Sequence, residues 1–112
     1  MTFFNFTDPP DSPSGLRVIE VYKDFVTIDW DVPKADGGSP ITQYVVEKLD
    51  ATRPGASWVV AGTVEASVLS YKVSKLFQGN AYLLRVAAEN RVGMSEPLEL
   101  ESPVIAKLPF GE

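Results

Sequence analysis

Two pairs of carboxylates are spaced so that they could act together. Asp29 and Asp31 lie two residues apart, as do Glu99 and Glu101, and residues at this spacing share one face of a β-strand. Such pairs can serve acid–base catalysis or bind calcium. Carboxylates on the wet face of a strand are, however, usually only hydrated. We therefore predict no catalytic residues and no metal-binding residues.

The stretch DGGSPITQYVVEK, residues 36–48, raises a second chemical possibility. A glycine-rich loop that cradles phosphate lies between a strand and a helix, and it usually supplies a lysine or a third spaced glycine. This stretch has neither and runs directly into β-forming residues. Gly37 and Gly38 can adopt positive φ at little cost, and Pro40 favours an extended Ser39. We interpret the stretch as a loop that opens a strand, and we predict no cofactor.

The residue types that are missing exclude most other chemistry. Histidine and cysteine are both absent, which excludes Ser-His-Asp and Cys-His nucleophiles, Cys/His zinc sites and disulfides. Ten basic residues, which are scattered, oppose fifteen acidic ones for a net charge of −5. Such a surface repels phosphate backbones and anionic lipids, and no apolar run approaches the roughly 20 residues of a membrane span. We predict a non-enzymatic protein that binds neither nucleic acid nor membrane.

The length of 112 residues leaves room for one domain with one core. The first residues, MTFFNFTDPP, lack the basic and apolar segments of a secretory signal peptide. They include Asn5-Phe6-Thr7, a glycosylation sequon that matters only in a secreted protein. We assign residues 1–12 to an N-terminal linker, 13–107 to the domain and 108–112 to a C-terminal linker.

The elements that position these residues are β-strands. Apolar and polar residues alternate with a period of two in short segments, each ended by Gly, Pro, Asn, Asp or Ser. Seven segments show this pattern: 16–21, 24–30, 41–48, 57–64, 68–73, 81–90 and 97–106, the last interrupted by Pro103. Short strands at such intervals favour an all-β, seven-stranded antiparallel β-sandwich, in which each sheet has one dry face and one wet face.

Several quoted stretches together resemble one known family. PPDSPSGLRV enters the first strand, Trp30 ends the second, DGGSPITQYVVEK opens the third, and VSKLFQGNAYLLRVAAENRVGMSEP covers the sixth. The chain resembles a fibronectin type III domain of the titin and twitchin family of giant muscle proteins over residues 8–108. The immunoglobulin domain, with the same general sandwich, fits less well. Its tryptophan lies on the third strand, and it would have a cysteine where this chain has Leu84.

The resemblance and the alternation together indicate the core. Trp30 should lie between the two sheets in place of a disulfide. Tyr82 should form a tyrosine corner, in which its hydroxyl bonds the backbone a few residues upstream. The predicted core comprises Trp30, Tyr44, Val46, Val26, Ile28, Leu76, Tyr82, Leu84 and Val86.

Outward positions on two strands that neighbour each other in this fold form a candidate partner face. Glu47 and Arg85 could pair there across the strands. Trp58 is expected near a sheet edge, either packed on the sheet or half exposed toward a partner. The candidate partner face comprises Val45, Glu47, Leu83, Arg85 and Trp58, with Ala87 also pointing outward.

An odd number of strands places the two chain ends at opposite poles. Short proline-containing stretches flank the domain and are stiffer than Gly/Ser linkers, so copies could form a semi-rigid rod that transmits tension. The resemblance implies a monomeric, cytoplasmic sarcomere module. Its partners would be neighbouring immunoglobulin and fibronectin type III domains in tandem, and myosin or other thick-filament proteins. The alternative is an extracellular adhesion or receptor module that binds a protein ligand.

Overall fold

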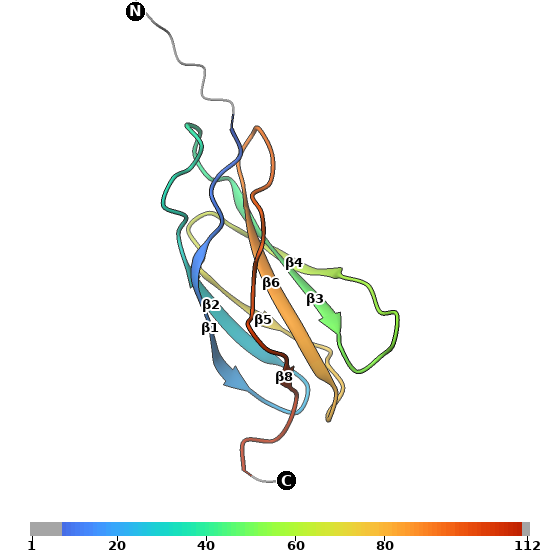
Figure 1. Cartoon of the computed structure of the whole chain (residues 1–112). Helices are drawn as coiled ribbons and strands as arrows, with labels where there is room; N and C mark the ends of the chain where they lie inside the picture. The colour runs from blue at the N-terminus through green and yellow to red at the C-terminus, as the bar shows by residue number, and fades with distance from the viewer. Residues whose placement is uncertain (1–7, 111–112) are drawn as a thin grey trace, which may run out of the picture.

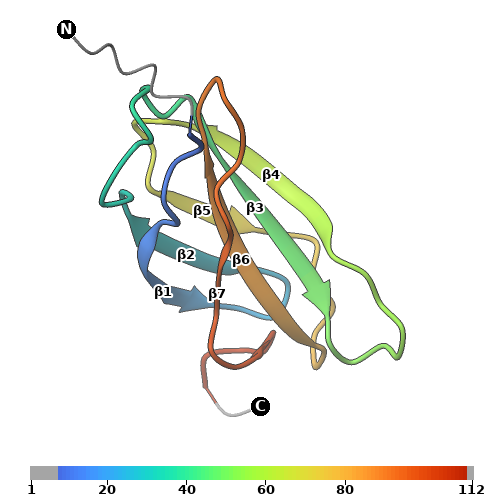
Figure 2. The same ribbon diagram turned by 45° about the horizontal axis from the view of Figure 1, so that its top comes forward.

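Two antiparallel sheets pack face to face in the computed structural model, which describes residues 8–110. The sequon at Asn5 lies outside these residues. The described part contains strands, turns and loops, with no helix among residues 8–110. The first sheet has the order β1-β2-β5, with β1 at Ser14–Val21, β2 at Val26–Asp31 and β5 at Ser70–Val73. The second has the order β4-β3-β6-β7, with β3 at Gln43–Asp50, β4 at Val59–Glu65, β6 at Ala81–Glu89 and β7 at Leu98–Glu99 (Figures 1 and 2).

The all-β antiparallel sandwich predicted from the sequence is confirmed, with one difference at the last strand. The predicted strand over 97–106 is two short strands, β7 and β8 (Val104–Ile105), which both pair with β6. Pro103 lies between them. Because proline has no backbone N–H, it cannot donate to the ladder of β6. Leu100 N–H still donates to the Leu84 carbonyl at 2.9 Å, so the ladder is interrupted over residues 101–103 and resumes at β8.

The core fills the space between the two sheets. All nine residues named as core from the sequence are at most 5% exposed. Trp30 of β2 and Tyr44 of β3 meet across the sandwich with ring centroids 5.4 Å apart and planes inclined at 59°. This tilted contact is a favourable geometry for two aromatic rings. Val73, Ala88 and Ala106 are also in this core.

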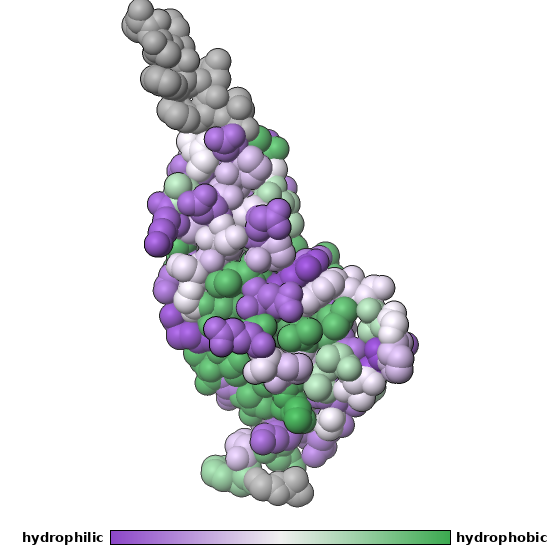
Figure 3. Space-filling view, viewed as in Figure 1, coloured by the Kyte–Doolittle hydropathy of each residue, from purple (hydrophilic) through white to green (hydrophobic). Residues whose placement is uncertain are grey.

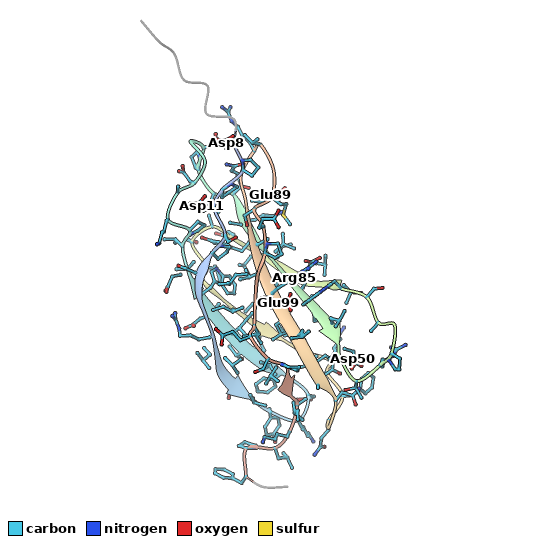
Figure 4. All side chains as sticks on the ribbon, in the orientation of Figure 1. Asp8, Asp11, Asp50, Arg85, Glu89 and Glu99 are labelled. Atoms are coloured by element: carbon cyan, nitrogen blue, oxygen red, sulfur yellow. The ribbon has the colours of Figure 1, made fainter. Side chains whose placement is uncertain are left out.

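The described ends of the chain lie at opposite poles of the sandwich (Figure 1). Asp8 is at one pole, where β6 ends (Figure 4). The last strand, β8, pairs with the start of β6 at the other pole, since Ala81 is the partner of Ile105. We call these the N-terminal pole and the C-terminal pole.

Residues 8–12, assigned to the linker, are bonded to the body of the domain. Asp11 N–H donates to the Ala35 carbonyl at 3.0 Å, and Ser12 Oγ donates to the Glu96 carbonyl at 2.7 Å. Pro10 is buried. The entering chain is therefore held against the N-terminal pole before β1 begins.

Candidate functional site

Arg85 occupies the centre of the outer face of the β4-β3-β6-β7 sheet. It lies opposite Glu47 on β3 and opposite Glu99 on β7, and Figure 4 shows Glu99 beside it. Arg85 Nε donates to Glu47 Oε1 at 2.7 Å. The guanidinium carbon of Arg85 lies 4.1 Å from the centroid of the Trp58 ring, which is half-buried. Glu47 and the indole together hold the guanidinium in one position.

The Arg85–Glu47 ion pair is more sheltered than a typical surface pair. The two side chains are 24% and 22% exposed, so solvent screens their attraction less than it screens a fully exposed pair. A guanidinium on the face of an indole adds a cation–π attraction of about 0.5–2 kcal/mol. An ion pair and a cation–π contact therefore hold Arg85, Glu47 and Trp58 together as one cluster.

The rest of the candidate partner face is less accessible than its outward direction suggests. Val45 is only 8% exposed and Ala87 only 4%. Both lie on the central strands β3 and β6, where side chains of strands on each side cover a short side chain. Leu83 is half-buried. Val45 and Ala87 thus offer a partner little surface, while Leu83 and the Arg85 cluster offer more.

The carboxylate pair at Asp29 and Asp31 is bonded to a cation. Arg17 Nε donates to Asp29 Oδ1 at 2.8 Å, and its two terminal nitrogens donate to Asp31 at 3.3 Å each. These hydrogen bonds, first to Asp31 and then to Asp29, raise the pKa of Arg17 above its ordinary value. Arg17 of β1 thus joins its strand to both carboxylates of β2. Within residues 8–110, no three Asp or Glu side chains gather into a site that could hold a metal ion.

The loop at residues 36–39 binds the entering chain. Gly37 and Gly38 have φ of 78° and 94°, and Asp36 Oδ1 accepts the N–H of Gly38 at 2.8 Å. A Cβ on Gly37 would stand 2.2 Å from the carbonyl oxygen of Asp8, so only glycine allows this approach. The loop then leads into β3. A shallow hollow of about 650 Å³ beside it is lined by 32–38 with Asp8 and Ile41.

Asn90, which the sequence analysis did not single out, joins three segments at this pole. Its Nδ2 donates to the carbonyls of Asp8 at 3.0 Å and Asp36 at 2.7 Å. Its Oδ1 accepts the N–H groups of Val92 at 2.8 Å and Gly93 at 3.1 Å. The side chain of Asn90 is buried and its donors and acceptor are all used. The signal in the sequence that could have identified Asn90 is its position at the end of a predicted strand, three residues before Gly93.

The tyrosine corner lies at the other pole. Tyr82 Oη accepts the N–H of Phe77 at 2.9 Å, which is five residues upstream. The same turn bonds the departing chain, because Gly79 N–H donates to the Ala106 carbonyl at 2.8 Å and Ala106 N–H donates to the Asn80 carbonyl at 3.1 Å. One hydrogen-bonded turn therefore fixes the position where the chain leaves the sandwich.

Among residues 8–110, no helix long and apolar enough to cross a membrane is present.

Comparisons with known proteins agree on one family. The family model described as fibronectin type III domain matches residues 11–101. Titin of Drosophila melanogaster is 42% identical over 94 residues, 84% of this chain and, after rounding, 0% of that protein. Fast-type myosin-binding protein C of Homo sapiens is 30% identical over 110 residues, 98% of this chain and 10% of that protein. The chain thus spans at most about a tenth of these relatives. The solved domains A168–A170 from titin are 40% identical with a TM-score of 0.80, covering 89% of this chain and 33% of that one.

Proposed function

The chain belongs to the fibronectin type III family, and from this premise we propose that it is a non-enzymatic structural module of a giant sarcomeric protein. It would be one unit of a tandem array in the cytoplasm of muscle, bearing tension and binding thick-filament proteins. The similarity to titin at 42% identity and to myosin-binding protein C at 30% supports this assignment. Both relatives are far longer than this chain, which fits a chain that is one module of a longer array.

The observation that carries the proposal is the position of the two ends. The chain enters at one pole and leaves at the other (Figures 1 and 2). Both ends are hydrogen-bonded to the body, at Asp11 and Ser12 on the entry side and at Ala106 on the exit side. A pull on the array therefore acts along the sandwich and is resisted by bonded backbone. This geometry supports neighbouring domains in tandem as the first partners.

The outer face around Arg85 is the surface that we assign to a thick-filament partner. Arg85 is fixed by Glu47 and Trp58, so little side-chain entropy remains to be lost when a partner binds. Arginine and tryptophan are the residue types that most often anchor protein interfaces. The name of one relative states that it binds myosin, and we propose myosin as the partner to test first.

Cosedimentation of the 112-residue chain with purified myosin filaments tests this proposal. The chain should pellet with the filaments, and Arg85→Ala should reduce the bound fraction. Lys34→Ala, which removes one positive charge from an exposed loop at the N-terminal pole, is the matched control and should bind as before. A chain that stays in the supernatant, or an Arg85→Ala chain that binds equally well, would contradict the assignment of this face.

The extracellular adhesion alternative predicts a different parent protein. A signal peptide or a membrane span upstream in the parent gene would favour adhesion. Tandem immunoglobulin and fibronectin type III domains without either would favour the sarcomere. Expression of a fluorescent fusion of the chain in striated muscle cells gives an independent answer, since a thick-filament module should appear in periodic bands.

A further inference from the structure

A cleft at the C-terminal pole is positively charged although the chain is acidic. The cleft has a volume of about 390 Å³, and Lys48, Arg53 and Lys75 line it. Among the described residues that line it, the only acidic side chain is Asp50, whose two oxygens already accept the N–H of Thr52 at 3.0 Å and the amide of Asn80 at 3.1 Å. None of the salt bridges found among residues 8–110 includes the three cations. The cleft therefore presents positive charge to whatever approaches it.

Phe77 stands at the rim of this cleft as a fixed apolar contact. Its side chain is 70% exposed, which is unusual for a large aromatic residue. Its N–H is bonded to Tyr82 Oη, and its carbonyl accepts the N–H of Asn80 at 3.1 Å. The tyrosine corner thus holds the backbone of Phe77 while the ring points away from the core. An exposed aromatic ring on a fixed backbone position is the kind of residue that anchors protein interfaces.

The chain leaves the domain beside the same ring. Ala106 exchanges backbone hydrogen bonds with Gly79 and Asn80, which follow Phe77 in one turn. Lys107, which is exposed, comes directly after this point. In the proposed array, the connection to the following domain would therefore leave the body beside Phe77 and the cleft. Apolar residues also gather over the half of the body nearer this pole in the face shown in Figure 3, whereas the half nearer the N-terminal pole is mostly polar.

The N-terminal pole has the opposite charge. Several exposed carboxylates lie there among the described residues, and the exposed cations beside them include Lys34 and Arg91. Figure 4 shows two of the carboxylates, Asp8 and Asp11, where the chain enters. Asp36 and Glu96 are further exposed members of this group. When such modules are joined in series, the positive pole of one faces the negative pole of the next.

We propose that the cleft and Phe77 form the seat of the following domain in the array, which docks through a carboxylate-bearing N-terminal pole like that of this chain. This inference rests on the proposed tandem function. The carboxylates of the follower pair with Lys48, Arg53 and Lys75, and the ring of Phe77 covers apolar surface such as the prolines of the entering segment. Because the follower is covalently attached, a small interface suffices to hold it. The joint between two modules is therefore semi-rigid and sensitive to salt.

The test uses two copies of the 112-residue chain joined in series as one polypeptide, with ¹⁵N in the first copy only. Compared with the single chain, amide signals of the first copy should shift around residues 53–57 and 75–80. The shifts should shrink when NaCl is raised from about 0.01 M to about 1 M, across which the Debye length falls from about 30 Å to about 3 Å. Unchanged signals in the joined chain would overturn the proposal, as would shifts that ignore salt.

Placement of the same substitution in either copy provides the matched control. Phe77→Ser or Arg53→Glu in the first copy should abolish the shifts, because both change the seat. The same substitutions in the second copy should leave the shifts intact, since nothing follows that copy. Equal effects from both placements would overturn the proposed seat. The measurement involves no muscle protein, so failure of myosin binding with intact docking would contradict the proposed function and leave the seat standing.

Discussion

Asn90 at the end of β6 donates a 3.0 Å hydrogen bond to the carbonyl of Asp8, more than eighty residues earlier in the chain. This bond, with the second one from Asn90 to Asp36, fixes the segment that enters the sandwich. The direction of the entering chain is therefore set by the body of the domain. A module that transmits force needs such a fixed connection at each end.

Asn90→Ala should weaken this connection. The substitution leaves the carbonyls of Asp8 and Asp36 and the N–H groups of Val92 and Gly93 without their partner, and a stranded buried polar group costs about 1–3 kcal/mol. Urea denaturation should show a loss of stability in this range. Hydrogen exchange of the Asp11 amide, which is bonded to Ala35, should accelerate more than exchange of amides in β6. An unchanged Asp11 rate would contradict the role of Asn90.

Trp30 should tolerate phenylalanine far better than alanine. Trp30→Ala removes a fully buried ring, which costs about 3–5 kcal/mol. The indole Nε1 has no hydrogen-bond partner among residues 8–110, so Trp30→Phe loses packing but no hydrogen bond and should cost clearly less. Denaturation midpoints of the two variants check this order. Equal losses would show that the contact with Tyr44 depends on the indole itself.

Tyr82→Phe should loosen the exit of the chain. The variant keeps the buried ring and removes the hydroxyl that accepts the N–H of Phe77 at 2.9 Å. We expect a stability loss of about 1–3 kcal/mol and faster hydrogen exchange at Phe77. Tyr22→Phe is the matched control, because it makes the same chemical change on the turn between β1 and β2. Comparable losses in both variants would contradict the special role of Tyr82.

Tyr44 makes the stability of the chain fall in alkali. Burial raises the pKa of its phenol above the ordinary value of 10.0. The folded chain keeps the proton at a pH where the unfolded chain releases it, so the contribution of Tyr44 is complete below pH 10 and declines as the pH rises further. Absorbance titration near 295 nm should show a phenol component that titrates above the ordinary tyrosine pKa, and Tyr44→Phe should remove that component.

Arg85→Ala should expose Trp58 to solvent. The guanidinium covers the indole face at 4.1 Å, while Trp30 stays buried in either case. Acrylamide should quench the tryptophan fluorescence of the variant more strongly, and its emission should shift to the red. Glu47→Gln removes the ion pair and keeps the shape of the side chain, so it should have a smaller effect. Identical quenching in all three proteins would contradict the stacked arrangement.

In β2, local alternation was enough to predict the strand and the side that faces the core. Val26, Ile28 and Trp30 alternate with polar residues, and all three are buried. The same rule did not predict that Val45 would be buried. Alternation indicates which face of the sheet a side chain points to, but not how far longer neighbouring side chains cover it. The position of Pro103 indicated an interruption of the predicted strand 97–106. It did not indicate that the two halves of this strand pair separately with β6.

Some contacts between distant segments could not be predicted from the sequence. The bonds from Asn90 to Asp8 and from Ser12 to Glu96 each join residues more than eighty positions apart. No local pattern encodes such pairs. The positive cleft was hidden for the same reason, since Lys48, Arg53 and Lys75 are scattered along the chain and gather only where the loop after β3 meets the turn before β6.

Stretching a polypeptide of identical copies of the chain, joined in series and held by its ends, tests most directly that the module bears tension from pole to pole. We expect discrete unfolding events of uniform length, one for each copy, because both described ends of every sandwich are bonded to its body. Smooth extension without discrete events, or release of residues 8–13 well before the sandwich opens, would contradict it.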